Sequence, residues 1–262
     1  MGGGLGITKL YRFKAVLSSR KDRYLYLEKP VRIDEIEFRP AESWNKLNVF
    51  FNVMADTDME ATSKAEKFID NLCTAILLST NIAVDVDSIN VVRIDEIQET
   101  SKSDARRTVI IVVHDVIKLK AEVSVGLGLD ESLLKSIIGI AGKITGFNEL
   151  VNRFFRWYRW GLLEKDPIDR FIKLWIAFEI WTEYRGYKKG EESEKTKMIN
   201  ALMKECKVDE KEADEMYGTR CSIFHSGVHD KALNKLSQLE KCLQNVILGI
   251  RQNASQQFAN LE

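Results

Sequence analysis

The sequence lacks the features that mark disordered and membrane-spanning proteins. It has three prolines among 262 residues and no low-complexity tract, so we expect a folded chain. No apolar run reaches the roughly 18 to 20 residues that cross a bilayer, because Gly139 and Gly142 interrupt the most hydrophobic stretch. We therefore expect no association with a membrane.

Cysteines are few and widely scattered. Cys73, Cys206, Cys221 and Cys242 include no Cys-x2-Cys pair, and no signal peptide precedes them. This pattern predicts reduced thiols in an intracellular protein. We expect a cytoplasmic location and no disulfide framework.

Net charge is also missing. Lys and Arg number 39, and Asp and Glu also number 39. A chain without net charge attracts nucleic acid only through a local cluster of cations. Any RNA contact must therefore come from such a cluster.

The hydrophobic pattern divides the chain into two halves. Residues 1–128 are rich in β-branched and aromatic residues and predict an α+β domain with one helix over residues 59–79. The predicted strands cover residues 10–17, 24–27, 31–38, 47–55, 89–97 and 109–125. A glycine-containing junction, Gly126 to Asp130, ends this half, and Asp130 can cap the next helix.

Residues 129–262 have helical periodicity and predict an all-α helical bundle. Its clearest helix begins at Asp166-Pro167, a capping residue followed by proline, and ends before Arg185-Gly186. The other predicted helices cover residues 131–143, 149–160, 195–206, 209–217 and 231–251. The sequence thus predicts two domains, 1–128 and 129–262.

Arg220 and His225 supply a fixed cation and a titratable base, the minimum needed to cleave RNA without a metal. The same pair also fits a surface cation and a hydrogen-bonded imidazole at a helix end. Each residue of a straight helix turns the chain by about 100°, so two residues five positions apart lie roughly 140° apart around the helix axis. A cooperating pair therefore requires a distorted turn between Gly218 and Gly227, or two copies of the chain related by a two-fold axis.

Two segments of the helical half resemble a known family. Residues 171–179 read Phe-Ile-Lys-Leu-Trp-Ile-Ala-Phe-Glu, and residues 220–227 read Arg-Cys-Ser-Ile-Phe-His-Ser-Gly. Together they resemble the Apea-like branch of the HEPN superfamily, all-α domains that carry an Arg-x4-6-His motif. The resemblance covers residues 153–251. It matches Arg220 and His225 to the motif and Glu179 to the buried acid of the first core helix.

The resemblance implies a metal-independent endoribonuclease that needs no cofactor and acts as a homodimer through its helical domain, in defence or a stress response. Arg220 and His225 would be catalytic, with Glu179 in a supporting role. Active members place Asn, Asp or His after the arginine, whereas this chain has Cys221. The alternative is a non-catalytic module that dimerises or binds a nucleotide or a protein. Ile223 and Phe224, between the two motif residues, are expected to pack in the core.

Three arginines, Arg153, Arg156 and Arg159, alternate with aromatic residues and suit contacts with an RNA backbone and its bases. The alternative is that the aromatics form a core with the arginines at its edge. A zinc site is the other alternative for the motif, because Cys221, His225 and His229 follow one another at four-residue steps. Gly227 opposes a continuous helix there, so we expect no metal.

Overall fold

The structure is a computed structural model that describes residues 8–20, 22–96, 109–110, 125–187, 190–226 and 232–259. The chain divides into two compact units between Thr145 and Gly146. The first contains an antiparallel sheet and the second is helical, in the predicted order. Among the described residues, no helix is both long and apolar enough to cross a bilayer.

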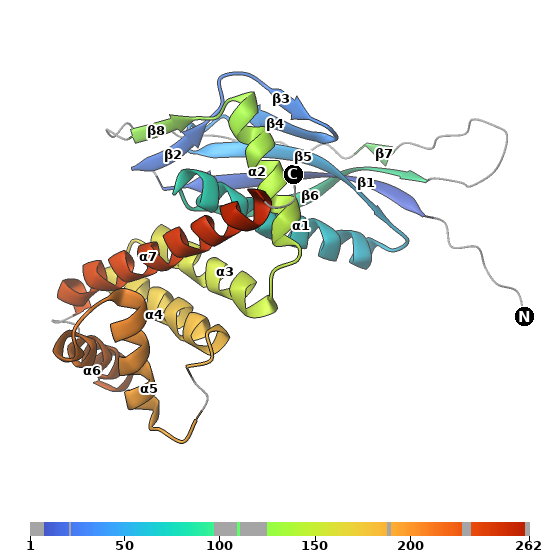
Figure 1. The fold of residues 1–262 in the computed structure, drawn as a ribbon. Helices are drawn as coiled ribbons and strands as arrows, with labels where there is room; N and C mark the ends of the chain where they lie inside the picture. The colour runs from blue at the N-terminus through green and yellow to red at the C-terminus, as the bar shows by residue number, and fades with distance from the viewer. Residues whose placement is uncertain are drawn as a thin grey trace, which may run out of the picture. The chain divides into compact units, whose positions relative to one another are not determined.

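The first unit is built on a sheet with β1 near its middle (Figure 1). Six strands pair antiparallel in the order β3-β4-β5-β1-β6-β7, and β2 pairs in parallel with β8. Their bounds are β1 Lys9–Ser19, β2 Arg23–Tyr26, β3 Val31–Ile33, β4 Ile36–Pro40, β5 Lys46–Ala55, β6 Val84–Glu96, β7 Val109–Ile110 and β8 Val125–Gly128.

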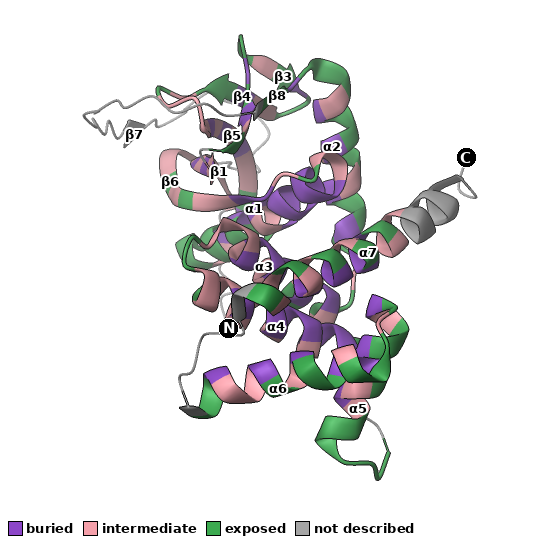
Figure 2. Ribbon diagram, turned by 90° about the vertical axis from the view of Figure 1, so that its left-hand side faces the viewer, coloured by how far each residue is buried: buried purple, intermediate pink, exposed green. Residues whose placement is uncertain are grey.

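Alternation along β1 assigns the two faces of the sheet. Tyr11, Phe13, Ala15 and Leu17 are buried, whereas the residues between them are partly exposed. Helix α1 (Asp58–Thr80) covers the buried face, and it carries a long buried stretch in Figure 2. Burial of four apolar side chains on each of the strands β1 and β5 is the main driving force for this layer.

One prediction for this unit needs correction, and another is mostly untested. The predicted strand over residues 31–38 is a hairpin, because Asp34 adopts a left-handed backbone (φ 51°) between β3 and β4. Aspartate tolerates that conformation better than most residues. Most of the predicted strand over residues 109–125 lies outside the described residues.

The division between units falls one helix later than the predicted boundary at residue 128. Helix α2 (Glu131–Ile144) packs against α1, and Asn71 Nδ2 lies 3.4 Å from Thr145 Oγ1. Asp130 caps α2 as predicted, because its carboxylate accepts from Leu133 N at 2.7 Å. Contacts on α1 therefore place α2 in the first unit, although its period is helical.

Five α-helices and one π-helical turn are described in the second unit. They are α3 Glu149–Leu163, α4 Pro167–Tyr184, α5 Glu194–Ala201, η1 Leu202–Cys206, α6 Glu210–Ser226 and α7 Ala232–Ala259. Helix α4 packs against both α3 and α7 and is largely buried (Figure 2). Asp166 accepts from the backbone N–H groups of Ile168 and Asp169, which confirms the predicted start of α4.

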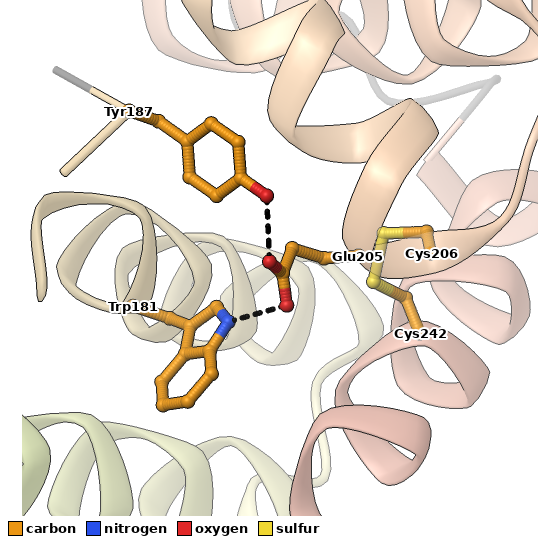
Figure 3. The surroundings of a disulfide bond; sticks show 5 residues. All are labelled: Trp181, Tyr187, Glu205, Cys206 and Cys242. Carbon is orange, nitrogen blue, oxygen red and sulfur yellow. Dashed lines mark hydrogen bonds between the residues drawn. A yellow bond between two sulfur atoms is a disulfide. The ribbon is translucent and has the colours of Figure 1, made fainter. Parts of the chain in front are cut away.

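A disulfide between Cys206 and Cys242 joins η1 to α7 (Figure 3). The expectation that all four cysteines are reduced is wrong for this pair. Their Cα atoms lie 4.4 Å apart although 36 residues separate them in sequence, so only the packing of the helices brings them together. The side chains of Cys73 and Cys221 are thiols.

Candidate functional site

The Arg-x4-His motif lies in the last two turns of α6, which runs through Gly218 without interruption. The predicted helix over residues 209–217 is therefore too short. A distorted turn at Gly218 does not form, and Gly227 lies outside the described residues. Arg220 and His225 consequently keep the roughly 140° separation of a regular helix.

Glu179 of α4 holds the side chain of Arg220. Its Oε1 accepts from Arg220 Nη2 at 3.3 Å and from Trp175 Nε1 at 2.8 Å. The ion pair is half-buried, with 25% of the Arg220 side chain and 28% of the Glu179 side chain exposed. Glu179, which the family resemblance predicted to be a buried acid, is therefore only partly buried.

Phe224 extends the contacts of Arg220 toward the surface. The guanidinium carbon of Arg220 lies 4.9 Å from the centroid of the Phe224 ring, within cation–π range. Phe224 is 44% exposed, so the expectation that it packs in the core is wrong. Ile223 is only 7% exposed, and its predicted packing role is confirmed.

Tyr217 and Cys221 occupy the helix surface between Arg220 and His225. The Tyr217 ring meets Trp175 edge-on, with 6.4 Å between the centroids. Burial and the adjacent Cys221, whose thiol shares a hydrogen bond with Tyr217, raise the pKa of the phenol. Cys221 therefore stands beside a phenol in its neutral form at physiological pH.

The exposed surface of α6 presents a cation and a base on opposite sides of an aromatic stripe. Successive angles of about 100° order these side chains as Arg220, Phe224, Tyr217, Cys221 and His225. Arg220 is partly neutralised by Glu179, and His225 is exposed. Within one chain, the two motif residues therefore do not lie on the same side of the helix.

The predicted RNA-binding arginines on α3 differ in their exposure. Arg153 is exposed and Arg156 is half-buried, whereas Arg159 is 1% exposed. Since a guanidinium at that depth cannot reach a nucleic-acid backbone, the prediction for Arg159 is corrected. The aromatic residues Phe154 and Tyr158 form core, as the alternative interpretation had it.

Sequence reasoning missed a second polar cluster, centred on Glu205 of η1. Its carboxylate accepts from Tyr187 Oη at 2.7 Å and from Trp181 Nε1 at 2.9 Å (Figure 3). It also accepts from Arg185 Nε at 3.3 Å. Partial burial would raise the pKa of Glu205, but these hydrogen bonds and the charge of Arg185 outweigh it and lower the pKa. Burial and the bond to Glu205 raise the pKa of Tyr187 to about 12. Glu205 is 18 to 24 residues away from these three partners in the sequence, and no local pattern indicated that they would meet.

Metal ligands do not converge in the part of the chain that the structure describes: no three His, Cys, Asp or Glu side chains there could hold one ion. His229, the third ligand of the zinc alternative, lies outside the described residues.

No protein-family model, curated protein or solved structure matches the chain. Function must therefore be argued from the chemistry of its own side chains.

Proposed function

We propose that the protein is a metal-independent endoribonuclease of the HEPN type. The observation that carries this proposal is the arrangement on α6, where Glu179 anchors a half-exposed Arg220 and His225 is exposed about one and a half turns further on. A fixed cation and a general base are what metal-free RNA cleavage at the 2′-hydroxyl requires.

In the proposed reaction, His225 accepts the proton of a ribose 2′-hydroxyl. The freed oxygen attacks the adjacent phosphorus while the bond from phosphorus to the 5′-oxygen breaks. The leaving oxygen takes a proton from a second imidazolium or from water, which gives a 2′,3′-cyclic phosphate and a 5′-hydroxyl. Arg220 stabilises the charge that builds on the phosphate oxygens.

Two copies of the chain are needed to assemble this site. Arg220 and His225 of one chain lie on different sides of α6. An isologous contact between two α6 helices would instead bring Arg220 of one copy near His225 of the other. Around α6, Phe224 lies between Arg220 and His225. Its aromatic side chain is 44% exposed and is suited to burial at such a contact. This supports the homodimer that the family resemblance implies.

A non-catalytic interaction module is the second candidate. Two observations favour it: Arg220 is paired with Glu179 and stacked on Phe224, which fits a role in joining α4 to α6, and Cys221 replaces the polar residue of active relatives. Such a module would use the same surface of α6 to bind a second copy, a nucleotide or a protein.

Cleavage of a mixed-sequence RNA in chelator separates the two candidates. The wild type should release fragments ending in cyclic phosphate, and His225→Ala should slow this by about 10²- to 10⁴-fold because general-base catalysis is lost. Lys211→Ala, on the exposed side of the same helix, is the matched control and should cleave normally. Cleavage that survives His225→Ala would contradict the assignment, and absence of cleavage in every sample would favour the module.

A further inference from the structure

The sheet of the first unit has a second face that carries an aromatic ring surrounded by cations. Phe50 of β5 lies opposite Lys14 of β1 and Glu37 of β4, and Arg32 of β3 lies opposite Glu37. Directly opposed residues of antiparallel strands share one face, as do residues two apart on a strand. We call the set Arg12, Lys14, Arg32, Glu37, Arg39 and Phe50 the Phe50 face.

The Phe50 face lies opposite the side covered by α1. The neighbouring residue Phe51 points to α1, with its ring centroid 4.6 Å from that of Phe68. Because successive side chains alternate, Phe50 projects from the other surface of the sheet. The side chains of Arg12 and Arg39 are 41% and 47% exposed, so solvent reaches this face.

Two guanidinium groups are held over the Phe50 ring. The guanidinium carbons of Arg39 and Arg12 lie 4.6 and 5.9 Å from its centroid. Glu37 fixes both groups: it accepts from Arg39 Nε and Nη2 at 2.8 and 3.0 Å, and from Arg12 Nη2 at 3.1 Å. The flat groups are therefore positioned before any ligand arrives, which lowers the entropy lost on binding.

Charge is concentrated here although the whole chain is neutral. The Phe50 face has four cations, Arg12, Lys14, Arg32 and Arg39, against the single carboxylate of Glu37. The pKa of Glu37 is lowered by the hydrogen bond from Arg39, which outweighs the effect of partial burial, and by the charges of the three arginines. The carboxylate therefore stays ionised and keeps its partners in place. An excess of three positive charges within one patch is complementary to a run of phosphates.

Amide side chains border the ring on the same face. Asn48 and Asn52 stand two residues before and after Phe50 on β5, and Asn90 of β6 lies opposite Lys14. Amides both donate and accept hydrogen bonds, as the edges of unpaired bases do. Stacked aromatic and guanidinium planes, cations and amides together form a surface for single-stranded nucleic acid. A duplex would hide its base faces from such a surface.

We propose that the Phe50 face binds single-stranded RNA, with bases stacking on the guanidinium and aromatic planes of Arg39 and Phe50 and phosphates contacting Arg12, Lys14 and Arg32. The choice of RNA rests on the proposed function, whereas the chemistry of the face stands independently of it. In this arrangement the first unit holds the strand that the second unit cleaves.

The experiment measures binding of the full chain to a fluorescent, non-cleavable 2′-O-methyl RNA of about 20 nucleotides by anisotropy at several salt concentrations. Phe50→Leu keeps an apolar side chain but removes the stacking plane, and it should weaken binding about 5- to 50-fold. Lys14→Gln should weaken binding and lower the salt slope by about 0.7. Lys135→Gln, which removes an exposed cation from α2, is the matched control and should bind like the wild type. Circular dichroism of each variant checks that it folds.

Separate outcomes identify which proposal fails. If Phe50→Leu and Lys14→Gln bind RNA as the wild type does, the Phe50 face is not the site, whatever the result for His225. If these variants lose binding while no RNA is cleaved by the wild type, the RNA surface stands and the ribonuclease proposal fails. Equal binding of duplex and single strand would overturn stacking. Self-association abolished by Phe50→Leu without RNA would assign the face to a second copy instead.

Discussion

Removal of the Cys206–Cys242 disulfide should destabilise the second unit strongly. The bond closes a loop with a sequence separation of 36 residues and ties η1 to α7. Both sulfur-bearing residues are buried, at 8% and 2% exposure, so reduction takes place mainly when the helices separate. The perturbation is either a reductant or the double substitution Cys206→Ala and Cys242→Ala.

The magnitude follows from the size of the loop. Loop closure over 36 residues removes about 13 cal/mol/K of entropy from the unfolded chain, which corresponds to about 4 kcal/mol at 25 °C. A unit of this size has an m-value of about 2 kcal/mol/M in urea, so the unfolding midpoint should fall by about 2 M. Since a domain is stabilised by only about 5 to 15 kcal/mol, loss of the bond removes a large share.

Tryptophan fluorescence reports this transition, because Trp157, Trp160, Trp175 and Trp181 belong to the second unit and only Trp44 to the first. Reductant should lower the urea midpoint of the wild type and leave that of the double variant unchanged. Thiol titration in denaturant should find two thiols before reduction and four after. Four thiols before reduction, or a midpoint indifferent to reductant, would refute the reasoning.

Two further predictions concern the second unit. Hydrogen bonds lower the pKa of Glu205 below its ordinary 4.5, so the ionised carboxylate stabilises the folded unit above that pH, and this contribution is lost as the pH falls through the folded pKa. Glu205→Gln should therefore reduce the loss of stability at acid pH, measured by urea titration at a series of pH values. An unchanged loss of stability at acid pH would contradict this prediction. Asp166→Ala should lower the stability of the second unit by about 1 kcal/mol through loss of the α4 cap, whereas Glu183→Ala, exposed near the other end of that helix, should have little effect.

Local signals in the sequence predicted the elements better than their grouping. The start of α4 was readable because Asp166 and Pro167 are adjacent, and the sheet strands because β1 and β5 alternate. The place of α2 in the first unit was not readable, since it depends on contacts with α1 that no local pattern encodes. Gly218 suggested an end of the helix, but α6 continues through it. Glycine disfavours a helix by only about 1 kcal/mol, which the rest of a long helix outweighs.

Pairs between distant segments decided how much of the site could be predicted. The family resemblance singled out both Glu179 and Arg220, 41 residues apart, but it did not predict the contact between them. The Glu205 cluster and the disulfide had no such guide and were missed. The Phe50 face was missed for a different reason, because its residues come from β1, β3, β4 and β5 and meet only through strand register. Periodicity assigns a residue to a face but does not name its neighbours across strands.

The central position of β1 has a consequence for how the protein is made. Lys9 pairs with Ala55 on one side and with Glu96 on the other, so the earliest strand of the chain gains its second neighbour last. At about 5 to 20 residues per second, a ribosome takes several seconds to produce β6 after β1 has emerged. Throughout that interval the apolar row from Tyr11 to Leu17 has an open edge. Until β6 has emerged, β1 is therefore an edge strand that can pair with another chain.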